Sequence, residues 1–135
     1  MLMQGISDER WLELEGLYAE NAVVEYPFAL PVPVRLDGLD AIRRYFAAAA
    51  AFPLRLRTRN LVVHDTDDPE VVVAEWDYEG LVTTTGRSFR VSNIQVSTIR
   101  EGKIVASRDY HNHVILADVM GRLPSLLGAI ADSTP

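Results

Sequence analysis

The chain has 135 residues, of which 48% are hydrophobic and 24% are charged, and its formal net charge is −6 at pH 7. An acidic protein is repelled by nucleic acid and by anionic membranes, so neither is expected as a partner. The sequence contains no cysteine, which excludes disulfides and thiolate metal sites and favours a cytoplasmic location. This length predicts one domain over residues 1–135.

The first half of the chain predicts two helices separated by a short strand and a loop. Ser7 is a candidate N-cap, and the helix that it begins is expected to end near Asn21. The apolar residues of this helix recur at helical spacing: Trp11, Leu14, Leu17 and Tyr18. A short strand is expected over residues 22–26 and, because of three nearby prolines, an extended loop over residues 28–36. A second helix is expected over residues 39–51, with four inward-facing residues: Ile42, Tyr45, Phe46 and Ala49.

The second half of the chain predicts strands. They are expected over residues 54–65, 71–85, 89–100 and 104–114. Short turns join the last three, which indicates an antiparallel meander, and the apolar tail over residues 115–127 predicts a short helix or lid. Helices followed by a long curved antiparallel sheet indicate an α+β fold. With a helix laid across its concave face, such a sheet forms a cone with an internal pocket.

Alternation within the second of these strands indicates which side chains face inward. Glu75, Asp77 and Glu79 occupy the odd positions, whereas Trp76 and Tyr78 occupy the even ones. Successive side chains of a strand point to opposite faces, so the acids are expected in solvent and the aromatic residues in the interior. The following strand is less clear, because one of its faces is rich in amides and the other is aliphatic.

The last strand carries the best candidates for chemistry. Asp109, His111 and His113 lie two residues apart and should therefore share one strand face. Burial would raise the pKa of Asp109 into the range that suits acid/base catalysis, and His111 could share its proton. The alternative is that Asp109 forms an ion pair with Arg90 or Arg108. Two histidines at this spacing are a weak signal for metal, so we expect neither a metal ion nor a cofactor.

The sequence resembles SnoaL-like members of the NTF2-like superfamily, which also includes ketosteroid isomerase, polyketide cyclases and limonene epoxide hydrolase. The resemblance covers nearly the whole chain. It rests on four segments: LYAENAVVE at residues 17–25, GLDAI at residues 38–42, EGKIV at residues 101–105 and RDY at residues 108–110. What it implies is a cone-shaped fold, with a curved sheet wrapped around N-terminal helices and a pocket inside.

The resemblance also has implications for individual residues. It orients seven of them into the cone: Tyr26, Trp76, Tyr78, Asn93, Gln95, Asp109 and His111. Asp109 takes the position of an acid/base Asp of the epoxide hydrolase. The other triad members of that enzyme fall on Trp76 and Tyr78, and the general base of ketosteroid isomerase falls on Tyr26. The resemblance therefore implies the scaffold without reproducing either known active site.

Two functions remain open from the sequence. The first is a cofactor-independent isomerase, cyclase or hydrolase acting on a small apolar oxygenated molecule, with Asp109 as the acid/base and His111 tuning it. Four residues would hydrogen-bond the substrate oxygens, namely Tyr26, Tyr78, Asn93 and Gln95. Three would form the apolar wall, namely Phe46, Trp76 and Leu116. The second function is a non-catalytic ligand-binding or dimerisation module, and a homodimer through the exposed sheet face is expected in either case.

Overall fold

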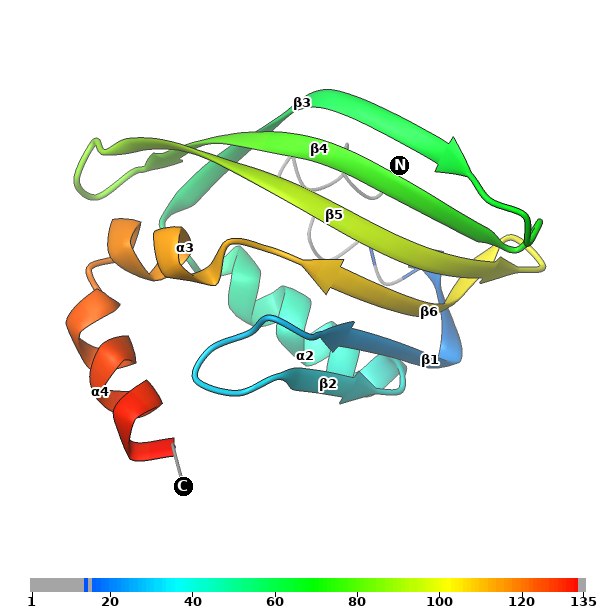
Figure 1. The fold of residues 1–135 in the computed structure, drawn as a ribbon, viewed down its shortest axis with the longest axis horizontal. Helices are drawn as coiled ribbons and strands as arrows, with labels where there is room; N and C mark the ends of the chain where they lie inside the picture. The colour runs from blue at the N-terminus through cyan, green and yellow to red at the C-terminus, as the bar shows by residue number, and fades with distance from the viewer. Residues whose placement is uncertain (1–13, 15, 134–135) are drawn as a thin grey trace.

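The computed structural model describes residue 14 and residues 16–133, in which six strands form one sheet and helices lie beside it (Figure 1). The strands are β1 (Tyr18–Tyr26), β2 (Val34–Asp37), β3 (Leu54–Asp65), β4 (Val71–Val82), β5 (Ser88–Arg100) and β6 (Lys103–Tyr110). The helices are α2 (Leu39–Ala50), α3 (His113–Val119) and α4 (Leu123–Ser133). The sheet order is β2-β1-β6-β5-β4-β3.

The predicted meander is confirmed. Strands β3, β4, β5 and β6 pair antiparallel in chain order, and β3 has the predicted bounds. Glu101 and Gly102 form the tight turn between β5 and β6, both with positive φ (51° and 75°). Glycine adopts this left-handed conformation without steric cost, which suits Gly102 to the turn. One pairing differs from a purely antiparallel sheet, because β1 runs parallel to β6.

The predicted elements are wrong in the N-terminal helix and in the proline-rich loop, and the last predicted strand ends earlier than expected, at Tyr110. The start of that helix lies outside the described residues, but residues 18–21 belong to β1 rather than to a helix. Tyr18 already pairs with Ile104 of β6, and this long-range pairing outweighs the local helical spacing. The expected loop over residues 28–36 contains the start of β2, which pairs antiparallel with β1.

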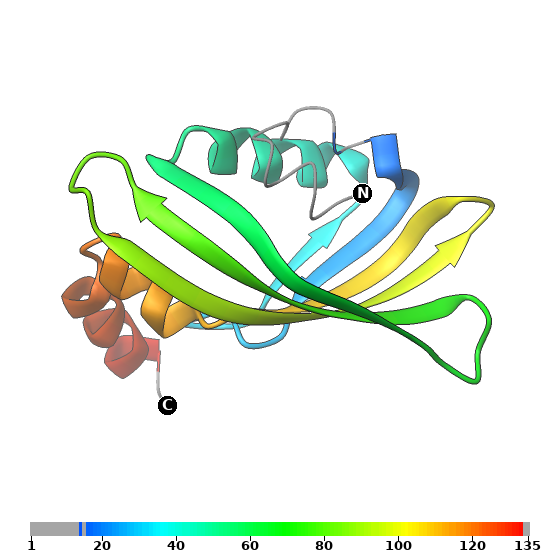
Figure 2. The same ribbon diagram turned by 90° about the horizontal axis from the view of Figure 1, so that it is seen from above.

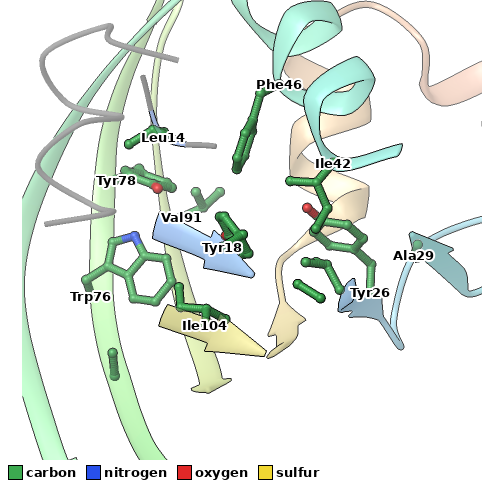
Figure 3. Close-up of a cluster of buried hydrophobic side chains, with 13 residues drawn as sticks. Leu14, Tyr18, Tyr26, Ala29, Ile42, Phe46, Trp76, Tyr78, Val91 and Ile104 are labelled. Carbon is green, nitrogen blue, oxygen red and sulfur yellow. The ribbon is translucent and has the colours of Figure 1, made fainter. Parts of the chain in front are cut away.

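Helix α2 closes the concave side of the curved sheet. Figure 2 shows α2 lying along the inside of the curve. Ile42 and Phe46 face the sheet and are 1% and 6% exposed, four residues apart as one face of a helix requires. Figure 3 shows both side chains directed toward aromatic residues of the strands, including Tyr18 and Tyr78. The core of the protein therefore lies between α2 and the concave face, as the cone fold predicts.

Helices α3 and α4 lie at one end of the sheet (Figure 1). Arg87, immediately before β5, donates to the Asp118 carboxylate at 2.8 Å and to the Asp118 carbonyl at 3.2 Å, which ties α3 to the β4–β5 turn. The expected helical tail is therefore present as two helices. None of the helices in the described part of the chain is long and apolar enough to span a bilayer.

Candidate functional site

A cavity of about 700 Å³ lies between the concave face, α2 and the C-terminal helices. Eight of the nine predicted site residues line it: Tyr26, Trp76, Tyr78, Asn93, Gln95, Asp109, His111 and Leu116. Phe46 is the exception. It packs in the core against Tyr18, with ring centroids 5.8 Å apart, so its assignment to the apolar wall is wrong.

Asp109 is the one carboxylate among the residues that line this cavity. It is 7% exposed, and Gln95, its register partner on β5, donates to its Oδ1 atom at 3.0 Å. Burial raises the pKa of Asp109 to about 6, and the hydrogen bond from Gln95 offsets part of that rise. The alternative of an ion pair does not hold in the described structure, because Arg90 bonds Asp77 at 2.6 Å and no cation pairs with Asp109.

The charge of the Asp109 carboxyl group acts on four tyrosine side chains, namely Tyr18, Tyr26, Tyr45 and Tyr78. Burial raises the pKa of each phenol, and the charge of Asp109 adds to each rise. All four hydroxyl groups therefore keep their protons at neutral pH, and Tyr26 and Tyr45 interact with each other through a side-chain hydrogen bond. A second negative charge is therefore unfavourable in the part of the cavity beside Asp109, and a neutral ligand is favoured there.

His111 follows the end of β6 and is bonded to Asn93 rather than to Asp109. Its Nδ1 atom lies 2.7 Å from Asn93 Oδ1. Burial and the neighbouring His113 lower the pKa of His111 to about 4, so the ring is neutral at pH 7. Because Asn93 Oδ1 can only accept, the hydrogen must sit on Nδ1. The predicted direct sharing of a proton between Asp109 and His111 is not the arrangement that the structure gives.

His113 is not on the strand, contrary to the prediction. Strand β6 ends at Tyr110, and the side chain of Asn112 accepts from Ile115 N at 3.1 Å, which caps α3. Asparagine before an apolar run is a common N-cap, and this signal was present in the sequence. His113 nevertheless lines the cavity. Within residues 16–133, no three His, Asp or Glu side chains gather as metal ligands would.

The sequence analysis did not identify the residues by which the helical part of the chain lines the cavity. Tyr45 of α2 stacks on Tyr26 with ring centroids 5.0 Å apart and lines the cavity beside it. Its helical spacing predicted an inward position but not a role in a site. Arg122, between α3 and α4, lies over the Phe52 ring at 5.5 Å and is the one Lys or Arg among the lining residues. Nothing in the tail sequence indicated that Arg122 would meet the cavity.

Comparisons with known proteins agree with the fold. The family model for the SnoaL-like domain matches residues 2–107. The uncharacterised protein YesE of Bacillus subtilis is 34% identical over 115 residues, which are 82% of this chain and 74% of YesE. A crystal structure of a Bacillus subtilis protein provisionally assigned as an isomerase aligns with a TM-score of 0.82 and 31% identity, covering 90% of this chain and 88% of that one.

A more distant structure, provisionally assigned as a polyketide cyclase from Xanthomonas campestris, aligns with a TM-score of 0.71 and 18% identity over 90% of each chain. This likeness concerns the fold. The family model spans well over half of the sequence, and the resemblance that the sequence suggested is confirmed. The chain therefore belongs to the SnoaL-like family and has the NTF2-like cone fold.

Proposed function

We propose that the cavity binds a small apolar oxygenated molecule and that Asp109 catalyses cofactor-independent acid/base chemistry on it. The observation that carries the proposal is the state of Asp109, a carboxyl group with a pKa near 6, almost fully buried and without a cationic partner in the described structure. A carboxyl group with this pKa is present in both protonation states near neutral pH, which suits proton transfer.

The walls of the cavity support an apolar ligand with a few oxygen atoms. Aromatic and aliphatic side chains predominate, and the polar groups among them are hydroxyls, amides, imidazoles, the Asp109 carboxyl group and the Arg122 guanidinium group. Ligand pockets are commonly built in this way. Isomerisation, cyclisation and hydrolysis each need proton transfer at a carbon or oxygen atom. The names of the related structures, an isomerase and a polyketide cyclase, are compatible with the first two. The cytoplasmic location stays a prediction from the lack of cysteine.

Ligand binding in the cavity is tested by filling it. Ala49 of α2 lines the cavity, whereas the adjacent Ala48 is exposed and does not. Terpenoid epoxides, steroids and aromatic polyketides are screened by thermal shift against the wild type. A ligand at 100 times its Kd is expected to stabilise the protein by about 2.7 kcal/mol, or several degrees. Ala49→Phe should abolish this shift and Ala48→Phe should keep it.

The screen separates three results. A shift lost only in Ala49→Phe supports binding inside the cone. A shift retained in both variants places the ligand elsewhere and contradicts the proposal. If no compound of these three classes shifts the wild type, the ligand class is wrong and the assembly function becomes the leading one.

We also propose that the chain forms a homodimer through the outer face of the sheet. Val62, Glu75, Ile94 and Tyr110 are successive register partners across four strands on the face opposite Trp76. Val62 and Ile94 are 49% and 42% exposed, and Phe28 packs edge-on against Tyr110 while remaining exposed. Exposed apolar side chains grouped on one face are typical of an interface.

Ile94→Glu is expected to convert the dimer to a monomer. The substitution places a second carboxylate beside Glu75 in the centre of this row, where a second copy of the chain would bury it without a cationic partner. Light scattering should give twice 15.1 kDa for the wild type and 15.1 kDa for Ile94→Glu. Leu127→Glu, at a residue of α4 that is 58% exposed, is the control and should remain dimeric. A wild type that is monomeric at micromolar concentration contradicts this proposal.

A further inference from the structure

Three buried polar atoms in the cavity wall have no hydrogen-bond partner among the described residues. They are Trp76 Nε1, Asn93 Nδ2 and His113 Nε2. Asn93 and Trp76 are 3% and 4% exposed, and all three residues line the cavity. Proteins leave few buried donors unpaired, because each loses its hydrogen bonds to water without replacement. A group of them on one wall indicates a place where the oxygen of a ligand is bound.

The orientation of the Asn93 amide is set by His111. An asparagine side chain presents an acceptor oxygen and a donor nitrogen, and the Nδ1–H group of His111 donates to the oxygen at 2.7 Å. The opposite end of the amide, Nδ2, is thereby turned away from His111. His111 also contacts the rings of Tyr26 and Trp76, with centroids 5.9 and 6.4 Å apart, and these contacts restrict its own rotation.

Trp76 carries the second donor, on the same face of the sheet as Asn93. Trp76 on β4 and Asn93 on β5 are register partners, so their side chains leave neighbouring backbone positions on the same face of the sheet. Figure 3 shows the indole nitrogen of Trp76 on the side of the ring that faces Tyr78. A side-chain hydrogen-bonding interaction with Trp76 lowers the pKa of Tyr78, so the indole N–H is directed toward the Tyr78 hydroxyl. Trp76 Nε1 has no partner within the usual hydrogen-bond limits, and a carbonyl oxygen would compete with that hydroxyl for it.

We propose that Asn93 Nδ2 and Trp76 Nε1 together bind the carbonyl oxygen of the ligand, and that His111 is a positioning residue for Asn93. Two N–H donors match the two lone pairs of a carbonyl oxygen, which has no proton that needs an acceptor of its own. Both nitrogen atoms are covered by neighbouring side chains. A small displacement of these side chains admits the oxygen, and the unmet hydrogen bonds favour it. The inference rests on the proposed function and narrows the ligand to a ketone or related carbonyl compound.

The first experiment needs no ligand. Nitrogen-15 NMR of the wild type, with His111 assigned by comparison with His111→Asn, reports which ring nitrogen carries hydrogen. We expect Nδ1 to be protonated and Nε2 to be unprotonated at pH 7. A ring protonated only on Nε2 would mean that Nδ1 accepts from the Asn93 amide, leaving the amide oxygen toward the cavity. That result overturns the carbonyl site, as does a ring protonated on both nitrogens at pH 7.

The second experiment compares 1-tetralone with tetralin, which has the same ring system without the carbonyl group. NMR titration of the wild type should show that the ketone binds more tightly. Asn93→Leu and Trp76→Phe should each weaken ketone binding by about tenfold and change tetralin binding little, because each variant removes one donor. His111→Leu should weaken the binding of 1-tetralone and leave the binding of tetralin unchanged. His111→Asn keeps a donor near the Nδ1 position and should restore much of the loss.

The outcomes separate this inference from the proposed function. If both compounds bind the wild type equally tightly, the proposal that the cavity binds an apolar molecule stands, but the proposed carbonyl site is contradicted. Equal losses for both compounds in His111→Leu indicate that His111 only supports packing, which contradicts its positioning role. If neither compound binds the wild type up to its solubility, the proposed ligand class fails and the carbonyl site fails with it.

Discussion

Replacing Asp109 by Asn is expected to slow proton transfer to and from a bound ketone by roughly 10²–10⁴-fold, the usual contribution of a general acid or base. The wild-type carboxylate would take the proton from the carbon next to the carbonyl group. The C–H electron pair then becomes the C=C bond of an enolate, and the carbonyl π electrons move to oxygen. Return of a solvent deuteron from Asp109 completes an exchange that NMR in D₂O measures directly.

The pH dependence of this exchange is set by the ionised form of Asp109. Only the carboxylate can accept a proton, so the rate should rise with pH, be half-maximal near pH 6 and stay level above it. A solvated aspartate would give the midpoint near pH 4. The side chain of Asp109→Asn has no carboxylate oxygen that can accept the proton. This variant should therefore show neither the wild-type exchange rate nor the half-maximal rate near pH 6.

Asp65→Asn is the matched control, because Asp65 is exposed at the end of β3 and does not line the cavity. It should exchange the ketone at the wild-type rate. Ligand binding by Asp109→Asn is measured separately, so that loss of catalysis is not confused with loss of affinity. If Asp109→Asn binds the ketone and exchanges it within threefold of the wild type, Asp109 is not the acid/base and the non-catalytic binding module is favoured.

Strand alternation predicted which side chains of β4 are buried. Period-two patterns fix which face a side chain occupies whenever one face is buried, and Trp76 and Tyr78 were assigned correctly for this reason. The pattern left the amides of β5 undecided. The family resemblance placed Asn93 and Gln95 inside, and both are buried. Burying an amide without hydrogen-bond partners is unfavourable. Hydropathy alone would therefore bury the aliphatic face of β5 and expose the face that carries the amides.

Predictions failed where distant segments decide the local structure. Tyr18 continues a helical pattern, yet it pairs with Ile104, more than eighty residues away in the sequence. Val34 follows a run of prolines and still forms a strand, because β1 offers an edge for pairing. His113 is a different case, because the last strand was predicted to run to residue 114, whereas it ends at Tyr110 and α3 begins at His113. The capping residue Asn112 was visible in the sequence and marks the start of the helix that was predicted from residue 115.

Single replacements of Asp109 and His111 are expected to change the pH dependence of stability in opposite directions. The folded pKa of Asp109 is about 6 against an ordinary value of 3.8. The folded protein therefore binds more protons than the unfolded chain between these values. The free energy of unfolding falls as pH rises through this interval, by about 3 kcal/mol, and this contribution is fully present only below pH 3.8.

His111 has the opposite sign. Its folded pKa is about 4 against an ordinary value of 6.5. Between these values the unfolded chain binds the extra proton, so the free energy of unfolding rises with pH, again by about 3 kcal/mol. This stabilisation is fully present above pH 6.5 and is lost as pH falls through 4.

The two contributions nearly cancel in the wild type. Between about pH 4 and 6, folding moves one proton from His111 to Asp109 without changing the number bound. In Asp109→Asn, the free energy of unfolding should therefore rise by about 3 kcal/mol between pH 4 and 7, because only the contribution of His111 remains. In His111→Asn it should fall by about the same amount, because only the contribution of Asp109 remains. The double variant should again show the pH dependence of the wild type. Urea unfolding from pH 4 to 7 at one protein concentration measures all four. Parallel curves would show that neither group is perturbed, and acid/base chemistry near neutral pH would lose its physical basis.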